Sequence, residues 1–152
     1  MPILVPPSGP SPARLMIVGE APGVEEELKL QPFVGASGQE LDRMLRDAGI
    51  MRSEAFVTNV CKVRPPSNDI GHFIAKSRAQ ITARHKLFRE KWVTPEIIDG
   101  ARILVAELET VKPNMVIALG NVALWVLTGK WGIKKWRGSM LEINTDELKL
   151  WL

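Results

Sequence analysis

The sequence has few of the residues that build cross-links and metal sites. Its 152 residues include one cysteine, Cys61, and two histidines, His72 and His85. A single cysteine excludes an internal disulfide and falls short of the ligands of an iron-sulfur cluster or a structural zinc site. We therefore expect no metal and no cofactor.

Long apolar runs and targeting signals are also missing. No stretch approaches the roughly 18 uninterrupted apolar residues of a membrane-spanning helix, and residues 1–7 lack both a basic segment and a small-residue cleavage site. We expect a soluble, cytoplasmic protein with no membrane partner. Residues 1–13 hold five prolines and no charge, so they predict an irregular leader outside the core. Residues 14–152 then form one domain, which we expect to be monomeric.

Positive charge is concentrated in two segments, although the formal net charge is only +3. The first segment, residues 76–91, contains six basic residues and a single acidic residue, Glu90. The second, residues 130–137, contains four basic residues interleaved with Trp131 and Trp136. Cations mixed with flat rings suit a nucleic-acid backbone with unstacked bases; the alternative is a solvated helix face and two core tryptophans. The basic residues are Lys76, Arg78, Arg84, Lys86, Arg89, Lys91, Lys130, Lys134, Lys135 and Arg137.

Short apolar runs predict three buried strands, at residues 15–18, 56–60 and 115–119, and residues 138–143 offer a last extended piece. The alternation of such strands with helical patterns predicts a three-layer αβα fold with a short central parallel sheet.

The helical patterns begin after a long loop, predicted for residues 20–36. Ser-Gly-Gln-Glu at 37–40 predicts a capping box for a helix that Gly49 ends. Thr94 and Pro95 predict the start of a helix that reaches Val111, and a short helix is predicted at residues 121–127.

Distinctive strings follow each predicted strand, where the carboxyl ends of parallel strands should form one crevice. They contain neither a phosphate-binding loop nor a dinucleotide fingerprint. In this order they resemble the uracil-DNA glycosylase superfamily, nearest to the bacterial and archaeal type called family 4, over about residues 14–138. The strings are Gly-Glu-Ala-Pro-Gly at 19–23, Pro-Phe-Val-Gly at 32–35, Thr-Asn-Val at 58–60, Lys-x-Arg-Pro-Pro-x-Asn at 62–68 and Ala-Leu-Gly-x-x-Ala at 118–123.

The resemblance implies hydrolysis of the N-glycosidic bond of a uracil flipped out of single- or double-stranded DNA, as in base-excision repair. Phe33 is then the ring that stacks on the base, although an ordinary core phenylalanine is the alternative. Asn59 reads the uracil edge, because an amide both donates and accepts; otherwise it caps a turn. The backbone of the first loop approaches the base and the sugar-phosphate at Gly19, Ala21, Pro22 and Gly23.

The resemblance also implies a catalytic carboxylate and DNA contacts. Glu20 orients water or stabilises an oxocarbenium-like sugar, unless it is only a surface carboxylate. Backbone N–H groups at a helix start suit a DNA phosphate, although a plain capped helix explains the same pattern. We therefore predict DNA contacts at Gly35, Ser37 and Gly38, and at Lys62 and Arg64 if these charges are not merely solvated.

The sequence departs from family 4 at two places. Val63 stands where a cluster cysteine is expected and the N-terminal cysteine pair is absent, so we expect no iron-sulfur cluster. In the family, an Arg-Gly pair like that at 137–138 is followed by an edge strand that ends in a His-Pro motif. This sequence ends at Leu152 without such a motif. The resemblance implies that the histidine of that motif donates a hydrogen bond to the uracil O2 as negative charge develops there. Losing one such donor costs about 10²–10³-fold in rate. We therefore expect a missing edge strand, and either weak activity or completion by another chain.

Two other functions remain open. A DNA-binding or scaffolding module would have kept the fold and lost the activity, and it predicts salt-sensitive binding without preference for uracil. A different small nucleotide-binding α/β enzyme is disfavoured by the missing phosphate-loop motifs.

Overall fold

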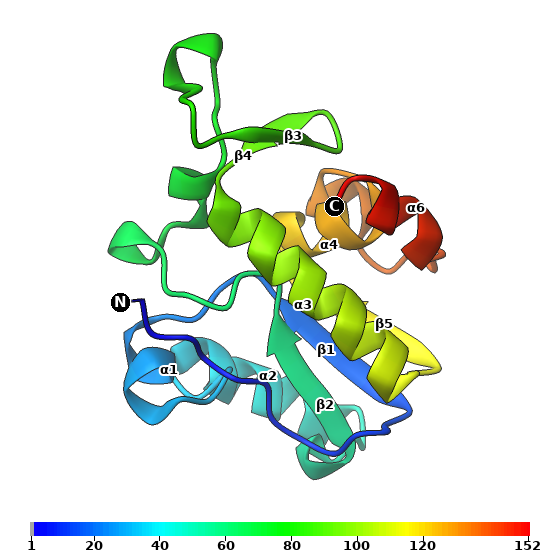
Figure 1. Cartoon of the computed structure of the whole chain (residues 1–152). Helices are drawn as coiled ribbons and strands as arrows, with labels where there is room; N and C mark the ends of the chain where they lie inside the picture. The colour runs from blue at the N-terminus through cyan, green and yellow to red at the C-terminus, as the bar shows by residue number, and fades with distance from the viewer. Residues whose placement is uncertain (1) are drawn as a thin grey trace.

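A three-stranded parallel sheet lies at the centre of the protein in the computed structural model, which describes residues 2–152 (Figure 1). Its strands are β1 (Leu15–Gly19), β2 (Ala55–Asn59) and β5 (Met115–Ala118), in the order β2-β1-β5. All three predicted strands are therefore confirmed, with ends that move by one residue. Residues 138–143 form no strand in the described part of the chain.

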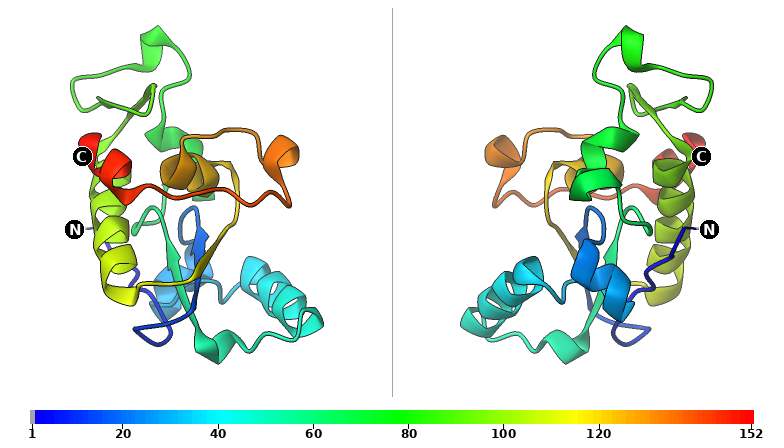
Figure 2. Two further views of the ribbon diagram at one scale, coloured as in Figure 1. Left: turned by 90° about the vertical axis from the view of Figure 1, so that its right-hand side faces the viewer. Right: turned by 90° about the vertical axis from the view of Figure 1, so that its left-hand side faces the viewer.

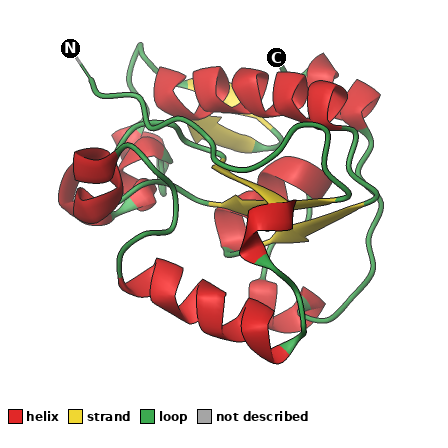
Figure 3. Ribbon diagram, turned by 90° about the horizontal axis from the view of Figure 1, so that it is seen from below, coloured by secondary structure: helices red, strands yellow, loops and turns green. Residues whose placement is uncertain are grey.

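Helices cover both faces of this sheet (Figure 3). Side chains alternate between the faces of a strand. Ile17 consequently packs with Leu41 and Leu45 of α2 (Ala36–Asp47). Its neighbours Met16 and Val18 instead join the core that contains α3 (Pro95–Val111), α4 (Asn121–Thr128) and Leu148 of α6 (Thr145–Leu150). The predicted three-layer αβα fold is confirmed.

The path of the chain reverses beside β1. It passes from β1 through α2 to the neighbouring β2, and then through α3 to β5 on the other side of β1. In open parallel sheets, ligands bind outside the carboxyl ends of the strands at such a reversal. The loops that follow β1 and β5 are therefore the first place to look for a site.

Two predictions about the first half of the chain need correction. The long loop predicted at residues 20–36 contains α1 (Val24–Lys29). The N-cap of α2 is Gly35 and makes no side-chain cap hydrogen bond, so Ser37 lies inside the helix and the predicted capping box does not form. The predicted helices α3 and α4 are confirmed, with Thr94 as the N-cap of α3.

The segment between β2 and α3 is a projection that the sequence patterns did not predict (Figure 2). It contains short 3₁₀ turns and an antiparallel hairpin of β3 (Lys86–Phe88) and β4 (Lys91–Val93). The basic stretch at residues 76–91 is therefore not the face of an α-helix. The 3₁₀ turns span Arg52–Glu54, which precedes β2, and Pro66–Asn68, Ile70–Phe73 and Arg78–Gln80.

The leader is irregular, as predicted, but it packs on the edge of the sheet. Ser8 and Val57 exchange two backbone hydrogen bonds, of 2.9 and 2.7 Å, and the Val5 N–H donates to the Lys62 carbonyl at 2.8 Å. Val5 is buried, so the prediction that the leader stays out of the core is wrong at this residue. No helix within residues 2–152 is both long and apolar enough to cross a membrane.

Candidate active site

Glu20 lies directly after β1 and reaches the start of α4. Its Oε2 accepts a hydrogen bond from the backbone N–H of Val122 at 2.7 Å. Gly120 has a φ of +98°, and a Cβ added there would lie 2.6 Å from the Glu20 Cδ. Glycine therefore permits this contact. The half-buried carboxylate is held at the reversal point, beside the partial positive charge of a helix start.

Phe33 and Asn59 meet at Gly19, the residue before Glu20. The register of the sheet pairs Gly19 with Asn59. A Cβ added to Gly19 would collide with the Phe33 ring and would lie 2.5 Å from the Asn59 Oδ1. No hydrogen bond joins the Asn59 amide to another residue in the described part of the chain, so its donor and acceptor remain available. The structure thus brings together the ring and the amide predicted from the sequence, at the residue that precedes the predicted carboxylate Glu20.

The orientation of Phe33 is set by its own backbone. Phe33 has a φ of +54°, a left-handed conformation that is uncommon for a large side chain. The Arg52 guanidinium donates to the carbonyls of Pro32 and Phe33 at 2.7 and 2.6 Å, and a Cβ on Gly38 would collide with the Phe33 carbonyl. Phe33 is partly buried and packs against the cluster that contains Ile17 and Leu41, so it is neither a fully buried core residue nor a fully exposed one.

A buried carboxylate ties the two halves of this loop together. Glu26 accepts hydrogen bonds from the backbone N–H groups of Gly23, Val34 and Gly35 at 3.0, 3.0 and 2.7 Å. Burial by itself would raise the pKa of Glu26, but these hydrogen bonds outweigh it and lower the pKa. The sequence analysis did not predict the roles of Glu26 and Arg52. For Glu26 the reason is that, in a run of three glutamates, nothing marks the one whose side chain is buried.

The helix-start prediction is only partly supported. The Gly35 N–H already donates to Glu26, and Gly38 is buried against the Phe33 carbonyl. The Gly35 N–H is therefore not free for a DNA phosphate, whereas the predicted contact at Gly38 stays a prediction. Ser37 is exposed and remains a candidate contact.

Lys62 has a structural role instead of the predicted contact with DNA. It is 5% exposed, and its ammonium donates to Thr58 Oγ1 and Glu107 Oε1, both at 2.8 Å, and to the Asn59 carbonyl. Burial lowers the pKa of Lys62, and the neighbouring Glu107 carboxylate opposes that shift. Since no ammonium proton is left for a phosphate, the prediction is wrong. The ion pair instead holds the end of β2 that carries Asn59.

Arg64 lies in the loop that follows β2. Its Nε donates to Asn68 Oδ1 at 2.6 Å, and that Asn68 oxygen lies 3.8 Å from the position of a Cβ on Gly23. The loop after β2 therefore touches the loop after β1, and the half-exposed Arg64 remains a candidate contact for a DNA backbone.

The residues present do not fit an iron-sulfur cluster. Cys61 is buried, its Sγ donates to the Val63 carbonyl at 3.3 Å, and burial raises the pKa of its thiol to about 11. Such clusters are held by several deprotonated cysteines. Within residues 2–152, no group of three or more histidine, cysteine or acidic side chains is placed to hold a metal.

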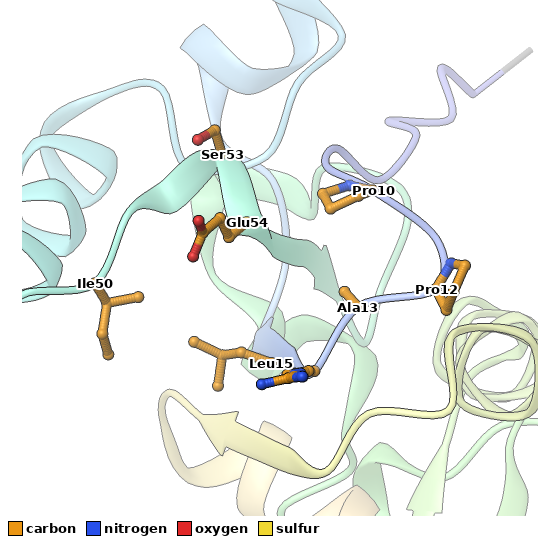
Figure 4. Close-up of a pocket in the computed structure, with 8 residues that line it drawn as sticks. Pro10, Pro12, Ala13, Leu15, Ile50, Ser53 and Glu54 are labelled. Carbon is orange, nitrogen blue, oxygen red and sulfur yellow. The ribbon is translucent and has the colours of Figure 1, made fainter.

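Two hollows of the surface are lined by other residues than those of the candidate site. One of about 620 Å³ is lined by the leader, by the start of β1 and by residues just before β2, including Pro12, Leu15 and Glu54 (Figure 4). A second, of about 600 Å³, lies between α2 and residues 49–53. Because both contain residues at the amino ends of strands, and none of Glu20, Phe33 and Asn59, we place the candidate site by its chemistry and not by hollow size.

Comparison with known proteins agrees with this geometry. The profile of the uracil DNA glycosylase superfamily matches residues 6–148. Type-4 uracil-DNA glycosylases of Archaeoglobus fulgidus, Thermotoga maritima and Saccharolobus solfataricus are 37%, 33% and 30% identical over 78%, 85% and 86% of this chain. The matches cover 49%, 57% and 51% of those relatives, so the chain spans about half of their length. A match over most of its residues shows that the chain belongs to the uracil-DNA glycosylase superfamily.

Proposed function

We propose that this protein is a uracil-DNA glycosylase, which hydrolyses the N-glycosidic bond of a uracil flipped out of DNA. The observation that carries the proposal is the meeting of Phe33 and Asn59 at Gly19, the residue before Glu20, at the carboxyl ends of the strands. Membership of the superfamily supports the same reaction.

The pocket selects the base by shape and by hydrogen bonding. A flipped base stacks on Phe33, while the Asn59 amide accepts from N3–H and donates to O4 of uracil. Cytosine presents the opposite pattern at that edge and would leave the amide unpaired in a buried position, which is a strong basis for rejection. The close approach of Gly19 to both side chains fixes their spacing.

Glu20 acts on the sugar. As the bond between C1′ and N1 lengthens, positive charge develops on the sugar and negative charge on the base. The carboxylate, anchored by the Val122 N–H, stabilises that positive charge and accepts a proton from the water that adds to C1′. Uracil leaves with the bonding electron pair and is then protonated. The backbone of Ala21, Pro22 and Gly23 lines the path of the sugar-phosphate, with Ser37 and Arg64 at its edges.

The direct test is uracil release from a single-stranded oligonucleotide with one uracil. We expect release by the unmodified chain and a fall of about 10²–10⁴-fold for Glu20→Gln. Asn59→Ala should also lose preference for uracil over cytosine. Glu54→Gln is the matched control, because Glu54 is an exposed carboxylate at the opposite end of β2.

Two outcomes would contradict the proposal. The first is DNA binding without uracil release, and without preference for uracil, by a folded chain; this would favour a binding module of the same fold. The second is release that is unchanged by Glu20→Gln and Asn59→Ala, since the reaction would then take place elsewhere.

A further inference from the structure

A second surface, outside the candidate active site, combines the exposed ring of Trp131 and the partly exposed ring of Trp136 with ammonium groups. It is formed by Lys91 of β4 and by residues 130–136, which include α5 (Ile133–Trp136). The hairpin and α5 lie toward the same end of the molecule, on either side of α4 (Figure 2). We call these residues the tryptophan-lysine surface.

Trp131 is the most exposed ring of this surface. Trp125 is fully buried, and Trp131 stands edge-on to it with 6.0 Å between ring centroids. The Lys91 ammonium lies 4.5 Å from the Trp131 centroid, within the range of a cation–π contact. Even so, 43% of Trp131 is exposed. The alternative of a core tryptophan is therefore wrong for Trp131.

Trp136 is surrounded by cations in the same way. The ammonium groups of Lys130 and Lys135 each lie 5.3 Å from its ring centroid. Asn121 Oδ1 accepts a hydrogen bond from the Ile133 N–H at 2.6 Å and so fixes the start of α5. Since Asn121 follows Gly120, which contacts Glu20, the tryptophan-lysine surface begins beside the candidate active site.

The distribution of charge favours an anionic polymer as the partner. The two basic segments, residues 76–91 and 130–137, contain ten of the 20 lysines and arginines but only one of the 17 acidic residues, Glu90. Arg89 is excluded from any contact because it is buried. Cations that alternate with exposed rings provide separate partners for phosphates and for unpaired bases.

We propose that the tryptophan-lysine surface binds single-stranded DNA, with bases stacked on Trp131 and Trp136 and phosphates on Lys91, Lys130 and Lys135. It would guide a strand toward Glu20, but it needs neither uracil nor catalysis to bind.

The test is the affinity for a labelled oligothymidine of about 12 nucleotides, measured by fluorescence anisotropy at several salt concentrations. Trp131→Ala should weaken binding about tenfold, which is the loss of roughly one stacked base, whereas Trp131→Phe should retain most of the affinity. The double variant Lys130→Gln/Lys135→Gln should lower the slope of log affinity against log salt by about 0.7 for each lost phosphate contact.

The matched control is Arg46→Gln/Lys149→Gln. It removes the same charge from exposed residues of α2 and α6. The proposal is overturned if the control weakens binding as much as Lys130→Gln/Lys135→Gln, or if a duplex of equal length competes as well as the single strand. Binding that is unchanged by Trp131→Ala, in a variant with unaltered thermal unfolding, would also overturn it.

Catalysis and this binding fail separately. Asn59→Ala and Glu20→Gln should lower uracil release, whereas Trp131→Ala should weaken oligothymidine binding. A folded chain that releases no uracil would therefore contradict the proposed function alone. Oligothymidine binding that is unchanged by Trp131→Ala would contradict the tryptophan-lysine surface alone.

Discussion

Replacing Lys62 by methionine should be among the most damaging single changes to the stability of this fold. Lys62 and Glu107 form an ion pair of 2.8 Å, with side chains 6% and 9% exposed. Removing one partner leaves the other charge buried and unpaired, which destabilises by about 3–5 kcal/mol. For a domain of this size, that corresponds to a fall of roughly 6–20 °C in the unfolding midpoint.

The measurement is urea and thermal unfolding, followed by tryptophan fluorescence and circular dichroism. The double variant Lys62→Met/Glu107→Leu should recover most of the lost stability, because it removes both buried charges and keeps a similar volume. Lys149→Met is the control: Lys149 pairs with Glu109 at 3.1 Å, but both side chains are about half exposed. Breaking that pair should cost about 0–1 kcal/mol.

The reasoning would be refuted by a Lys62→Met variant as stable as Lys149→Met, or by a double variant no more stable than Lys62→Met. The pair also holds the Asn59 carbonyl. The double variant should therefore fold and yet discriminate uracil from cytosine less well than the unmodified chain.

Three further predictions follow from the same contacts. Gly19→Ala should lower uracil release about 10²-fold in a folded protein, because the added methyl displaces Phe33 and Asn59; an unchanged rate would show that their spacing is unimportant. Glu26 has a lowered pKa in the fold, so its stabilisation is present above pH 4.5 and is lost as the pH falls through the folded-state pKa. Glu26→Gln should flatten that part of the acid-unfolding curve. An identical curve would contradict the role of Glu26 in holding the two halves of the loop together. Finally, the Cys61 thiol, with a pKa of about 11, should react with a thiol reagent at pH 8 only after unfolding.

Local patterns in the sequence account for much of the fold. The strands β1, β2 and β5 are short apolar runs that end at turn residues, and α3 begins at a Thr-Pro pair, so each is determined by nearby residues. The strings after the strands likewise predicted Glu20, Phe33 and Asn59 as candidate site residues, since parallel strands bring their carboxyl ends to one edge.

Contacts between distant residues were not predictable from local patterns. Glu26 accepts from the N–H of Gly35, the N-cap residue of α2, which lies nine residues away. Lys62 pairs with Glu107, 45 residues along the chain, which reverses its role from a surface contact to a buried support. The hairpin of β3 and β4 joins two three-residue strands, which are too short to give a clear alternation.

The sequence by itself determined the order of the three sheet strands and of the helices α2, α3 and α4, the family, and the three residue types of the candidate site. It could do so because each depends on spacing within a short segment. Tertiary structure alone decided which charges are buried and which rings are exposed: Lys62 and Arg89 lie inside, whereas Trp131 lies outside. Burial depends on what the rest of the chain packs against a side chain, and this is the information that a local pattern does not contain.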